Sequence, residues 1–242
     1  MGTSPDTLRQ HDLTIVQPET GYRFSLDPLL LTRFCRHPGG ECRVIDLGTG
    51  SGVIPLVLAR LTDSARFIGV ENNPAMAALA AENVRLNRLE ERIEIITDDI
   101  LNLRSRLPVS SFDLVISNPP FRNRQTGRVS PHAGRDVARH ETTAGLADFL
   151  AVAKYLVKPG GRICFIHHPS RLAEFVSVAT DMKLALLRLR MVHGSVGAEA
   201  KMFMAELAKS SKGGLTIEPP LIVYDGSGNY TAEAAAMLGM GK

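Results

Sequence analysis

The stretch of sequence that decides the fold runs from residue 43 to residue 52 and reads RVIDLGTGSG. Its first half, Arg43–Leu47, is a short apolar run that predicts a buried strand, and a helical pattern begins soon afterwards near Pro55. The glycines at positions 48, 50 and 52 permit a sharp turn and a close approach of the backbone to a ligand. The stretch therefore predicts a strand, a turn and a helix, with either a ligand at the turn or a tight connection that needs none.

On both sides of this stretch, apolar runs alternate with helical patterns. Buried strands are predicted at residues 66–71, 92–97, 112–117 and 162–167, with helices at 55–61, 74–87 and 146–157. Two further strands, at 184–192 and 202–207, follow near the end. Such alternation predicts an α/β fold in which a mostly parallel sheet is covered by helices on both faces.

Composition excludes several classes of protein. The 242 residues are 44% hydrophobic and 22% charged, which suits one globular domain with a sizeable core. No apolar run reaches the roughly eighteen residues of a membrane span, and the first ten residues are polar, so a cytoplasmic protein is expected. Cys35, Cys42 and Cys164 are widely spaced, which predicts buried free thiols rather than disulfides or a zinc site. The adjacent His167 and His168 have no further ligand nearby, so we expect no metal.

Acidic side chains follow the first three predicted strands, where ligands of open α/β sheets bind. Glu71 ends the second strand, about twenty residues after the glycine turn, and its carboxylate can accept both hydroxyls of a ribose. Asp46 suits a cationic amino group or a bound water. A dinucleotide-binding fingerprint would need glycine where Val53 stands, so a pyrophosphate is not expected.

The third strand ends in two aspartates, and two asparagines follow the second. Asp99, in preference to Asp98, can accept a hydrogen bond from the exocyclic amine of an adenine, or it can cap the short turn at residues 100–103. Asn72 and Asn73, ahead of Pro74, are favoured as caps of the next helix, although Asn72 also lies where a cofactor would pass.

The tetrapeptide Asn118-Pro119-Pro120-Phe121 directly follows the fourth strand and indicates the reaction. Its two prolines stiffen the backbone and leave the carbonyls of Asn118 and Pro119 without their usual N–H partners. An amide side chain, a free carbonyl and an aromatic ring can together hold a planar amine or amide. The alternative, a rigid turn with a buried phenylalanine, needs none of this chemistry.

A basic segment follows the tetrapeptide. Residues 122–140 contain one acid, Asp136, and five arginines, which are Arg122, Arg124, Arg128, Arg135 and Arg139. Interspersed glycine and proline predict a loop longer than a simple connection needs. Contact with a polyanion is favoured over a merely solvated loop, because the segment adjoins the candidate site.

These residues together resemble the class I S-adenosylmethionine-dependent methyltransferases, in the branch with an Asn-Pro-Pro-aromatic motif. More narrowly, the chain resembles the tRNA1(Val) adenine-37 N6-methyltransferase family. That narrower likeness rests on Gln17-Pro18, on GYRFSLD at residues 21–27, on PPLIVY at 219–224 and on YTAE at 230–233. One departure is Phe121, where tyrosine is common in adenine-directed relatives and phenylalanine also occurs in guanine-N2-directed enzymes.

The resemblance implies a Rossmann-like, seven-stranded sheet with an antiparallel last strand, formed by residues 43–242, with residues 1–42 packing near the active site. It implies S-adenosylmethionine as cofactor and an RNA partner, most simply tRNA. It assigns catalysis to Asn118, Pro119 and Phe121. It assigns cofactor binding to Asp46, Gly48, Thr49, Gly50, Gly52, Glu71, Asn72, Asp98, Asp99 and Asn118. Substrate contacts are expected from Tyr22, Phe24, Arg122, Arg124, Arg135 and Arg139, with simple packing of Tyr22 and Phe24 as the alternative.

Three other functions stay open from the sequence. A guanine-N2 ribosomal RNA methyltransferase would use the same tetrapeptide. A protein glutamine-N5 methyltransferase would hold an amide in the same pocket, but such enzymes usually carry a helical domain ahead of the cofactor loop. An inactive RNA protein that only binds S-adenosylmethionine is disfavoured, because every proposed reacting position holds a competent residue.

Overall fold

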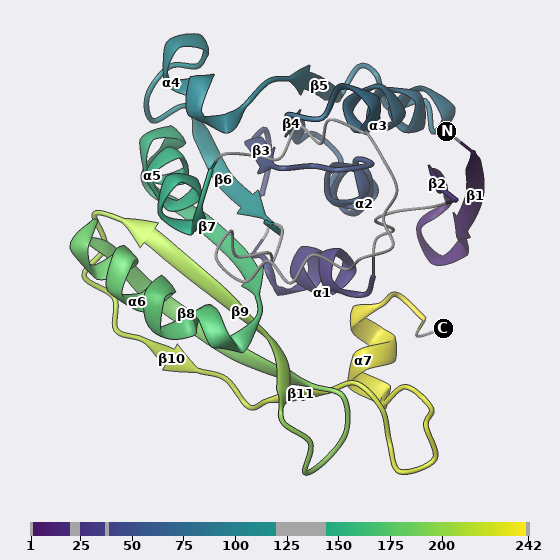
Figure 1. The fold of residues 1–242 in the computed structure, drawn as a ribbon, viewed down its shortest axis with the longest axis vertical. Helices are drawn as coiled ribbons and strands as arrows, with labels where there is room; N and C mark the ends of the chain where they lie inside the picture. The colour runs from purple at the N-terminus through teal and green to yellow at the C-terminus, as the bar shows by residue number, and fades with distance from the viewer. Residues whose placement is uncertain (1, 20–24, 37–38, 120–143, 241–242) are drawn as a thin grey trace, which may run out of the picture.

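The alternating strands and helices form one twisted sheet with helices on both faces (Figure 1). This computed structural model describes residues 2–19, 25–36, 39–119 and 144–240. Among these residues the main sheet has nine strands, in the spatial order β10, β8, β9, β7, β6, β3, β4, β5, with β11 also pairing with β8. The strands are β3 (Arg43–Leu47), β4 (Arg66–Glu71), β5 (Ile93–Thr97), β6 (Phe112–Ser117), β7 (Val157–His167), β8 (Leu184–His193), β9 (Ala200–Lys209), β10 (Thr216–Ile217) and β11 (Leu221–Ile222).

The predicted sheet is confirmed in class, with a small difference in strand number. Seven long strands are present, and two strands of two residues each, β10 and β11, add to the edge at β8. Among the described strands of this sheet, only β9 runs antiparallel to its neighbours, β7 and β8. The expected antiparallel strand is therefore the last long one in the chain, and it lies inside the sheet rather than at its end.

Strand residues alternate between two apolar cores, which is why helices cover both faces. Val44, Leu114 and Cys164 face a core that contains α1 (Asp27–Phe34), α2 (Val53–Leu61) and α3 (Pro74–Leu86). Their neighbours in sequence, among them Ile45 and Phe165, face a second core with α4 (Leu103–Arg106), α5 (Leu146–Leu156) and α6 (Leu172–Asp181). The short α7 (Ala232–Met237) also packs against the first core.

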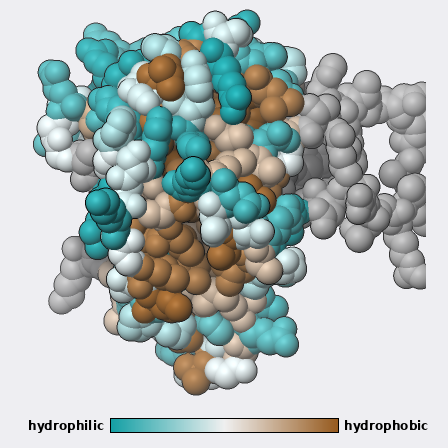
Figure 2. All heavy atoms as spheres, turned by 90° about the vertical axis from the view of Figure 1, so that its left-hand side faces the viewer, coloured by the Kyte–Doolittle hydropathy of each residue, from teal (hydrophilic) through white to brown (hydrophobic). Residues whose placement is uncertain are grey.

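One face of the molecule carries exposed apolar side chains. On the side that bears α6 and β10, apolar atoms gather between polar ones (Figure 2). Val176 of α6 is 38% exposed there and Ile217 of β10 is 67% exposed. Within the described ranges, no helix is long and apolar enough to cross a membrane. The three cysteines are free and buried, as predicted.

The N-terminal hairpin was not predicted. Strands β1 (Thr3–Leu8) and β2 (Leu13–Pro18) form a separate two-stranded antiparallel sheet. The free edge of β2 pairs with the side chains of Asn83 in α3 and of Asn87, which caps the C-terminal end of α3, instead of with another strand. Asn83 Oδ1 accepts from Val16 N at 2.7 Å, and Asn87 Oδ1 accepts from Thr14 N at 2.9 Å. The amide nitrogens of the two asparagine side chains donate to the carbonyls of Val16 and Thr14. Two side chains four residues apart in the sequence therefore make the hydrogen bonds that a neighbouring strand would make.

The edge of the sheet at which the parallel strands end positions the candidate site. Strands β3, β4, β5, β6 and β7 all run in the same direction, so their carboxyl ends meet at this edge. The glycine turn, Glu71, the two aspartates and Asn118 follow these ends directly.

Candidate active site

The glycine turn after β3 adopts a backbone that other residues rarely take. Gly48, Gly50 and Gly52 have φ values of +78°, +58° and +83°. The amides of Gly48 and Thr49 both donate to the carbonyl of Val70 on β4, at 2.9 Å each. The turn is thus bound to the neighbouring strand, and the predicted sharp bend is confirmed.

Glu71 holds this turn in place from the end of β4. One carboxylate oxygen accepts the amide of Gly50 at 2.9 Å, and the other accepts the amide of Asn73 at 2.9 Å. A carboxylate oxygen has a second lone pair, so hydroxyl groups can still bind to it. Asn73 caps α3 by accepting from Ala75 N and Met76 N, as expected, and Asn72 lies half-buried between Glu71 and Asn73.

Asp46 is a buried carboxylate that lacks a partner. The residue is 1% exposed, and within the described residues neither carboxylate oxygen accepts a hydrogen bond. Burial raises the pKa of Asp46 to about 7; the nearby Thr49 hydroxyl opposes this rise, and the charge of Glu71 adds to it. Such a group is stabilised by a cation. It therefore fits the ammonium group of an amino-acid-bearing cofactor beside the glycine turn.

The two aspartates after β5 are both engaged in the local loop. Asp98 accepts from Asp99 N and from the Asn102 side chain at 2.8 Å each, and it forms an ion pair with Arg106 at 2.8 Å. Asp99 accepts from Leu101 N at 3.0 Å and so caps the 3-10 turn η2 (Ile100–Asn102). The capping interpretation of Asp99 is confirmed, and its further role toward a cofactor stays a prediction.

Asn118 and Pro119 follow β6, next to the glycine turn. The Ser117 hydroxyl donates to the Leu47 carbonyl at 2.7 Å and ties the end of β6 to the end of β3. Asp46 pairs in register with Ile116, so Asn118 lies two residues beyond Asp46 on the adjacent strand. Pro119 is buried, and the buried Asn118 Oδ1 has no hydrogen-bond partner in the part of the chain that the structure describes. An acceptor in that state fits an N–H donor of a ligand.

Several predicted residues lie outside the described ranges. They are Tyr22, Phe24, Phe121, Arg122, Arg124, Arg135 and Arg139. The described part of the candidate site therefore consists of the residues around the glycine turn that are predicted to bind cofactor, together with Asn118 and Pro119. Among the described residues, no group of three or more His, Cys, Asp or Glu side chains that could bind a metal ion forms around His167 and His168. Burial, with a smaller contribution from Arg171, lowers the pKa of His167 to about 4, so this imidazole is neutral near pH 7.

Two residues that support the site were not predicted. Asn83 is fully buried and donates to the Ser51 carbonyl in the glycine turn at 2.9 Å, so it links that turn to the N-terminal hairpin. Gly69 on β4 leaves room for Thr49, because a Cβ there would lie 2.9 Å from the Thr49 hydroxyl oxygen. For Asn83, the only signal in the sequence was a pair of asparagines four residues apart on an otherwise apolar helix face.

Comparisons with known proteins agree with this geometry. The model of the methyltransferase small domain family matches residues 27–176. A predicted O-methyltransferase from Agrobacterium tumefaciens shares the fold, with a TM-score of 0.71 at 22% identity over 88% of this chain and 96% of that one. A geranyl diphosphate C-methyltransferase from Streptomyces coelicolor A3(2), solved with S-adenosyl-L-homocysteine, superposes with a TM-score of 0.56 at 12% identity, over 75% and 78% of the two chains. The chain is thus an S-adenosylmethionine-dependent methyltransferase with a Rossmann-like fold.

Relatives in sequence narrow the assignment. A tRNA1(Val) (adenine(37)-N6)-methyltransferase from Porphyromonas gingivalis is 33% identical over 226 residues, which cover 90% of this chain and 88% of that protein. The enzyme of that name from Shigella dysenteriae is 30% identical over 245 residues, covering 98% and 97%. This chain belongs to the tRNA1(Val) (adenine(37)-N6)-methyltransferase family.

Proposed function

We propose that this protein transfers the methyl group of S-adenosylmethionine to the exocyclic N6 of an adenine in tRNA, and that it does so in the cytoplasm. The observation that carries the proposal is the buried Asn118 Oδ1, which follows β6 beside the glycine turn and has no hydrogen-bond partner among the described residues. The names of the relatives support tRNA as the substrate and adenine as the base.

The cofactor-binding residues have separate tasks in this proposal. Asp46 pairs with the cationic amino group, the glycine turn lets the backbone approach, and Glu71 accepts the ribose hydroxyls. Asp99 receives the exocyclic amine of the cofactor's adenine, with Asp98 and Asn72 lining the same pocket. When bound, the cofactor supplies an electrophilic methyl group on a sulfonium.

Asn118 and Pro119 act on the target nitrogen. The lone pair of an adenine N6 is delocalised into the ring and is therefore a weak nucleophile. When the two N6 protons are donated to Asn118 Oδ1 and to the Pro119 carbonyl, the nitrogen moves toward tetrahedral geometry and the lone pair is available for in-line attack. The new N–C bond forms as the C–S bond breaks, and the ammonium proton then passes to these oxygens or to water. Phe121 stacks on the extruded base in this proposal.

The decisive experiment is a product analysis with the purified protein. We expect N6-methyladenosine in the nuclease digest of unmodified tRNA after incubation with S-adenosylmethionine, measured by mass spectrometry. N2-methylguanosine in ribosomal RNA would instead show a guanine-N2 methyltransferase, and N5-methylglutamine in a protein substrate would show a glutamine-N5 methyltransferase. Either result would contradict the proposal. Cofactor binding without any product would indicate an inactive binding protein.

A further inference from the structure

The tip of the β8–β9 hairpin projects beyond the active-site edge of the sheet. His167, at the end of β7, pairs with Phe203 of β9. Three residues closer to the tip, Ala200 pairs with His193, and Gly194 follows. Along β8, Met191 pairs with Phe203, so Gly194 lies three residues beyond the level of His167, or about 10 Å at the usual rise of a strand. The hairpin thus forms a wall that projects past the carboxyl ends of β6 and β7.

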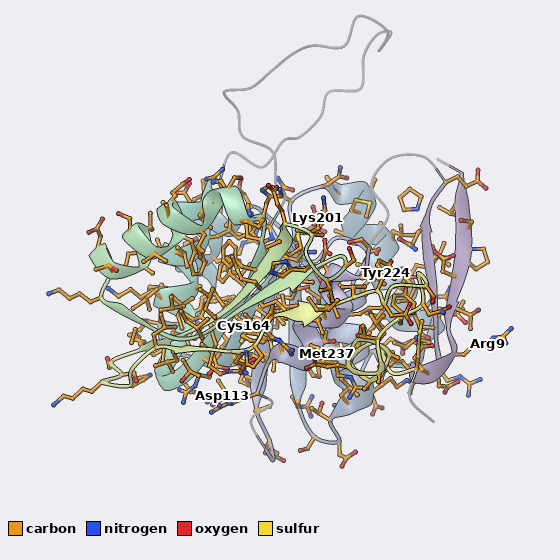
Figure 3. All side chains as sticks on the ribbon, turned by 90° about the horizontal axis from the view of Figure 1, so that it is seen from below. Arg9, Asp113, Cys164, Lys201, Tyr224 and Met237 are labelled. Carbon is orange, nitrogen blue, oxygen red and sulfur yellow. The ribbon has the colours of Figure 1, made fainter. Side chains whose placement is uncertain are left out.

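A turn with two stacked tyrosines lies along this wall. We call residues 224–230 the tyrosine turn. The amide of Tyr224 donates to the Gly194 carbonyl at 2.8 Å, so the turn begins at the hairpin tip. The rings of Tyr224 and Tyr230 stack with centroids 5.2 Å apart and planes 24° from parallel, and Tyr224 is 37% exposed. In Figure 3, Lys201 of β9 and Asp113, near the start of β6, lie toward opposite ends of the sheet, and Tyr224 lies between these two levels.

Hydrogen bonds fix the shape of the tyrosine turn. The Asp225 carboxylate accepts from Ser227 N at 2.8 Å and from Asn229 N at 3.0 Å, and Asp225 N donates to the Asn229 carbonyl. Just after the turn, Thr231 bonds to the carbonyls of Ile222 and Val223. The two rings are thereby held in one arrangement before any ligand arrives, which lowers the entropy lost on binding.

Arg190 of β8 anchors the chain on both sides of the tyrosine turn. Its guanidinium donates to the Pro219 carbonyl at 2.9 Å and pairs with Glu233 at 2.5 Å. Arg190 itself is buried, at 9% exposed, while the Glu233 side chain is 56% exposed, so the Pro219 contact is the more shielded of the two. The C-terminal segment is therefore fixed to the same sheet edge as Asn118.

We infer that Tyr224 and Tyr230 form a second RNA contact, on which a base near the methylated nucleotide stacks. This inference rests on the proposed function. From β6 to β11, which leads into Tyr224, the sheet crosses β7, β9 and β8, or about 19 Å at the usual strand spacing, which a few nucleotides can span. A tyrosine pair held in place and partly exposed is the kind of surface on which unpaired bases stack.

The charges near the tyrosine turn favour stacking over phosphate binding. Exposed Asp225 and Glu199 offset the exposed Lys201, so the described residues of this part of the wall carry no excess of positive charge. Contacts with phosphates would need such an excess and would weaken steeply with salt. We therefore expect the contribution of the tyrosines to depend little on salt concentration.

The test compares Tyr224→Leu, Tyr230→Leu and Tyr224→Phe in methyl transfer to full-length tRNA. Each leucine variant should raise the KM for tRNA about five- to twentyfold, in line with the loss of one stacked base, while kcat and the Kd for S-adenosylmethionine stay within twofold. Tyr224→Phe keeps the ring and should match the wild type. Val109→Ala changes an exposed apolar residue before the start of β6, at the opposite edge, and should leave the KM unchanged. Melting temperatures verify folding of each variant.

The outcomes separate this inference from the proposed function. A wild type that methylates tRNA together with leucine variants of unchanged KM would overturn the stacking contact alone. Tyr224→Phe as impaired as Tyr224→Leu would also overturn it, because the ring would then not be the feature that matters. A wild type that neither binds nor methylates RNA, or that methylates a protein, would overturn both.

Discussion

The two halves of the active-site edge differ in how they use their polar groups. At the ends of β3, β4 and β5, Glu71, Asp98 and Asp99 all accept backbone amides and so hold their own loops. At the end of β6, the buried oxygen of Asn118 has no hydrogen-bond partner among the described residues. The first half is thus built largely before ligand arrives, with Asp46 as its exception, whereas the second half presents an acceptor that the substrate satisfies in the proposed function. We expect substitutions in the first half to change cofactor affinity and those in the second to change the rate.

The largest expected effect is that of Asn118→Ala. Removal of the acceptor leaves N6 planar and unactivated, so kcat for tRNA methylation should fall by about a hundred- to a thousandfold, the usual cost of losing one catalytic hydrogen-bonding group. The Kd for S-adenosylmethionine, measured by calorimetry, should change less than threefold. Wild-type turnover in this variant would contradict the assigned role, and a large loss of cofactor affinity would remove the difference between the two halves.

Glu71→Ala tests the opposite half. The variant loses the acceptor for Gly50 N and Asn73 N as well as the proposed ribose contact, and such charged hydrogen bonds contribute about 1.5–3 kcal/mol each to binding or stability. We expect the Kd for S-adenosylmethionine to rise about thirty- to a hundredfold, with kcat at saturating cofactor within about fivefold of the wild type. Glu71→Gln keeps the shape and should lose less. A kcat defect at saturation as large as that of Asn118→Ala would contradict this division of tasks.

Local patterns in the sequence were sufficient for most of the sheet and for the site. The long strands are apolar runs bounded by turn residues, and the glycine turn and Asn118 directly follow such runs. Strands β2 and β11 could not be predicted in this way. Strand β2 is completed by side chains of α3 more than sixty residues away, and β11 has only two residues, paired with the end of β8. Strand pairing of that kind depends on tertiary contacts that no short window contains.

The burial of Asp46 shows a second limit. Its position after a strand was visible in the sequence, but the absence of any described partner for its carboxylate was not, because that depends on which groups surround it. The same holds for Asp99: the sequence offered a cap as the alternative to a cofactor contact, and only the structure shows that the cap is formed. The sequence was sufficient to place these side chains at the ends of strands, but the hydrogen-bond partners of each carboxylate could be seen only in the structure.

Asp46→Asn should separate stability from cofactor binding. The pKa of Asp46 is raised from 3.8 to about 7 in the folded protein, so the folded state binds more protons than the unfolded state between these values. Without cofactor, the free energy of unfolding should therefore fall as the pH rises from about 4 to about 7, by up to roughly 4 kcal/mol at about 1.4 kcal/mol per tenfold change in proton affinity. Asparagine should abolish most of this slope and raise the melting temperature at pH 8.

The same variant should bind S-adenosylmethionine about tenfold more weakly, because it lacks the charge that pairs with the ammonium group. In the wild type, the affinity should rise with pH through about 7 as Asp46 ionises, and this rise should be absent in Asp46→Asn. Calorimetric titrations at pH 6, 7 and 8 measure both effects. An identical pH profile in the two proteins would show that Asp46 does not meet the cofactor's cation.

The smallest expected effect distinguishes two asparagines of the same helix. Asn83 and Asn87 both complete the edge of β2, but within the described residues only Asn83 also bonds to the Ser51 carbonyl in the glycine turn. Alanine at either position should lower the free energy of unfolding by about 2–3 kcal/mol, because buried backbone groups lose their partners. Only Asn83→Ala should also weaken S-adenosylmethionine binding, by about three- to tenfold, since the turn that Glu71 holds from one side loses its support from the other. Denaturation curves measure the loss of stability of the two variants, and calorimetry measures their cofactor affinity. Equal cofactor affinities would mean that the N-terminal hairpin stabilises the ends of β3, β4 and β5 without positioning the glycine turn.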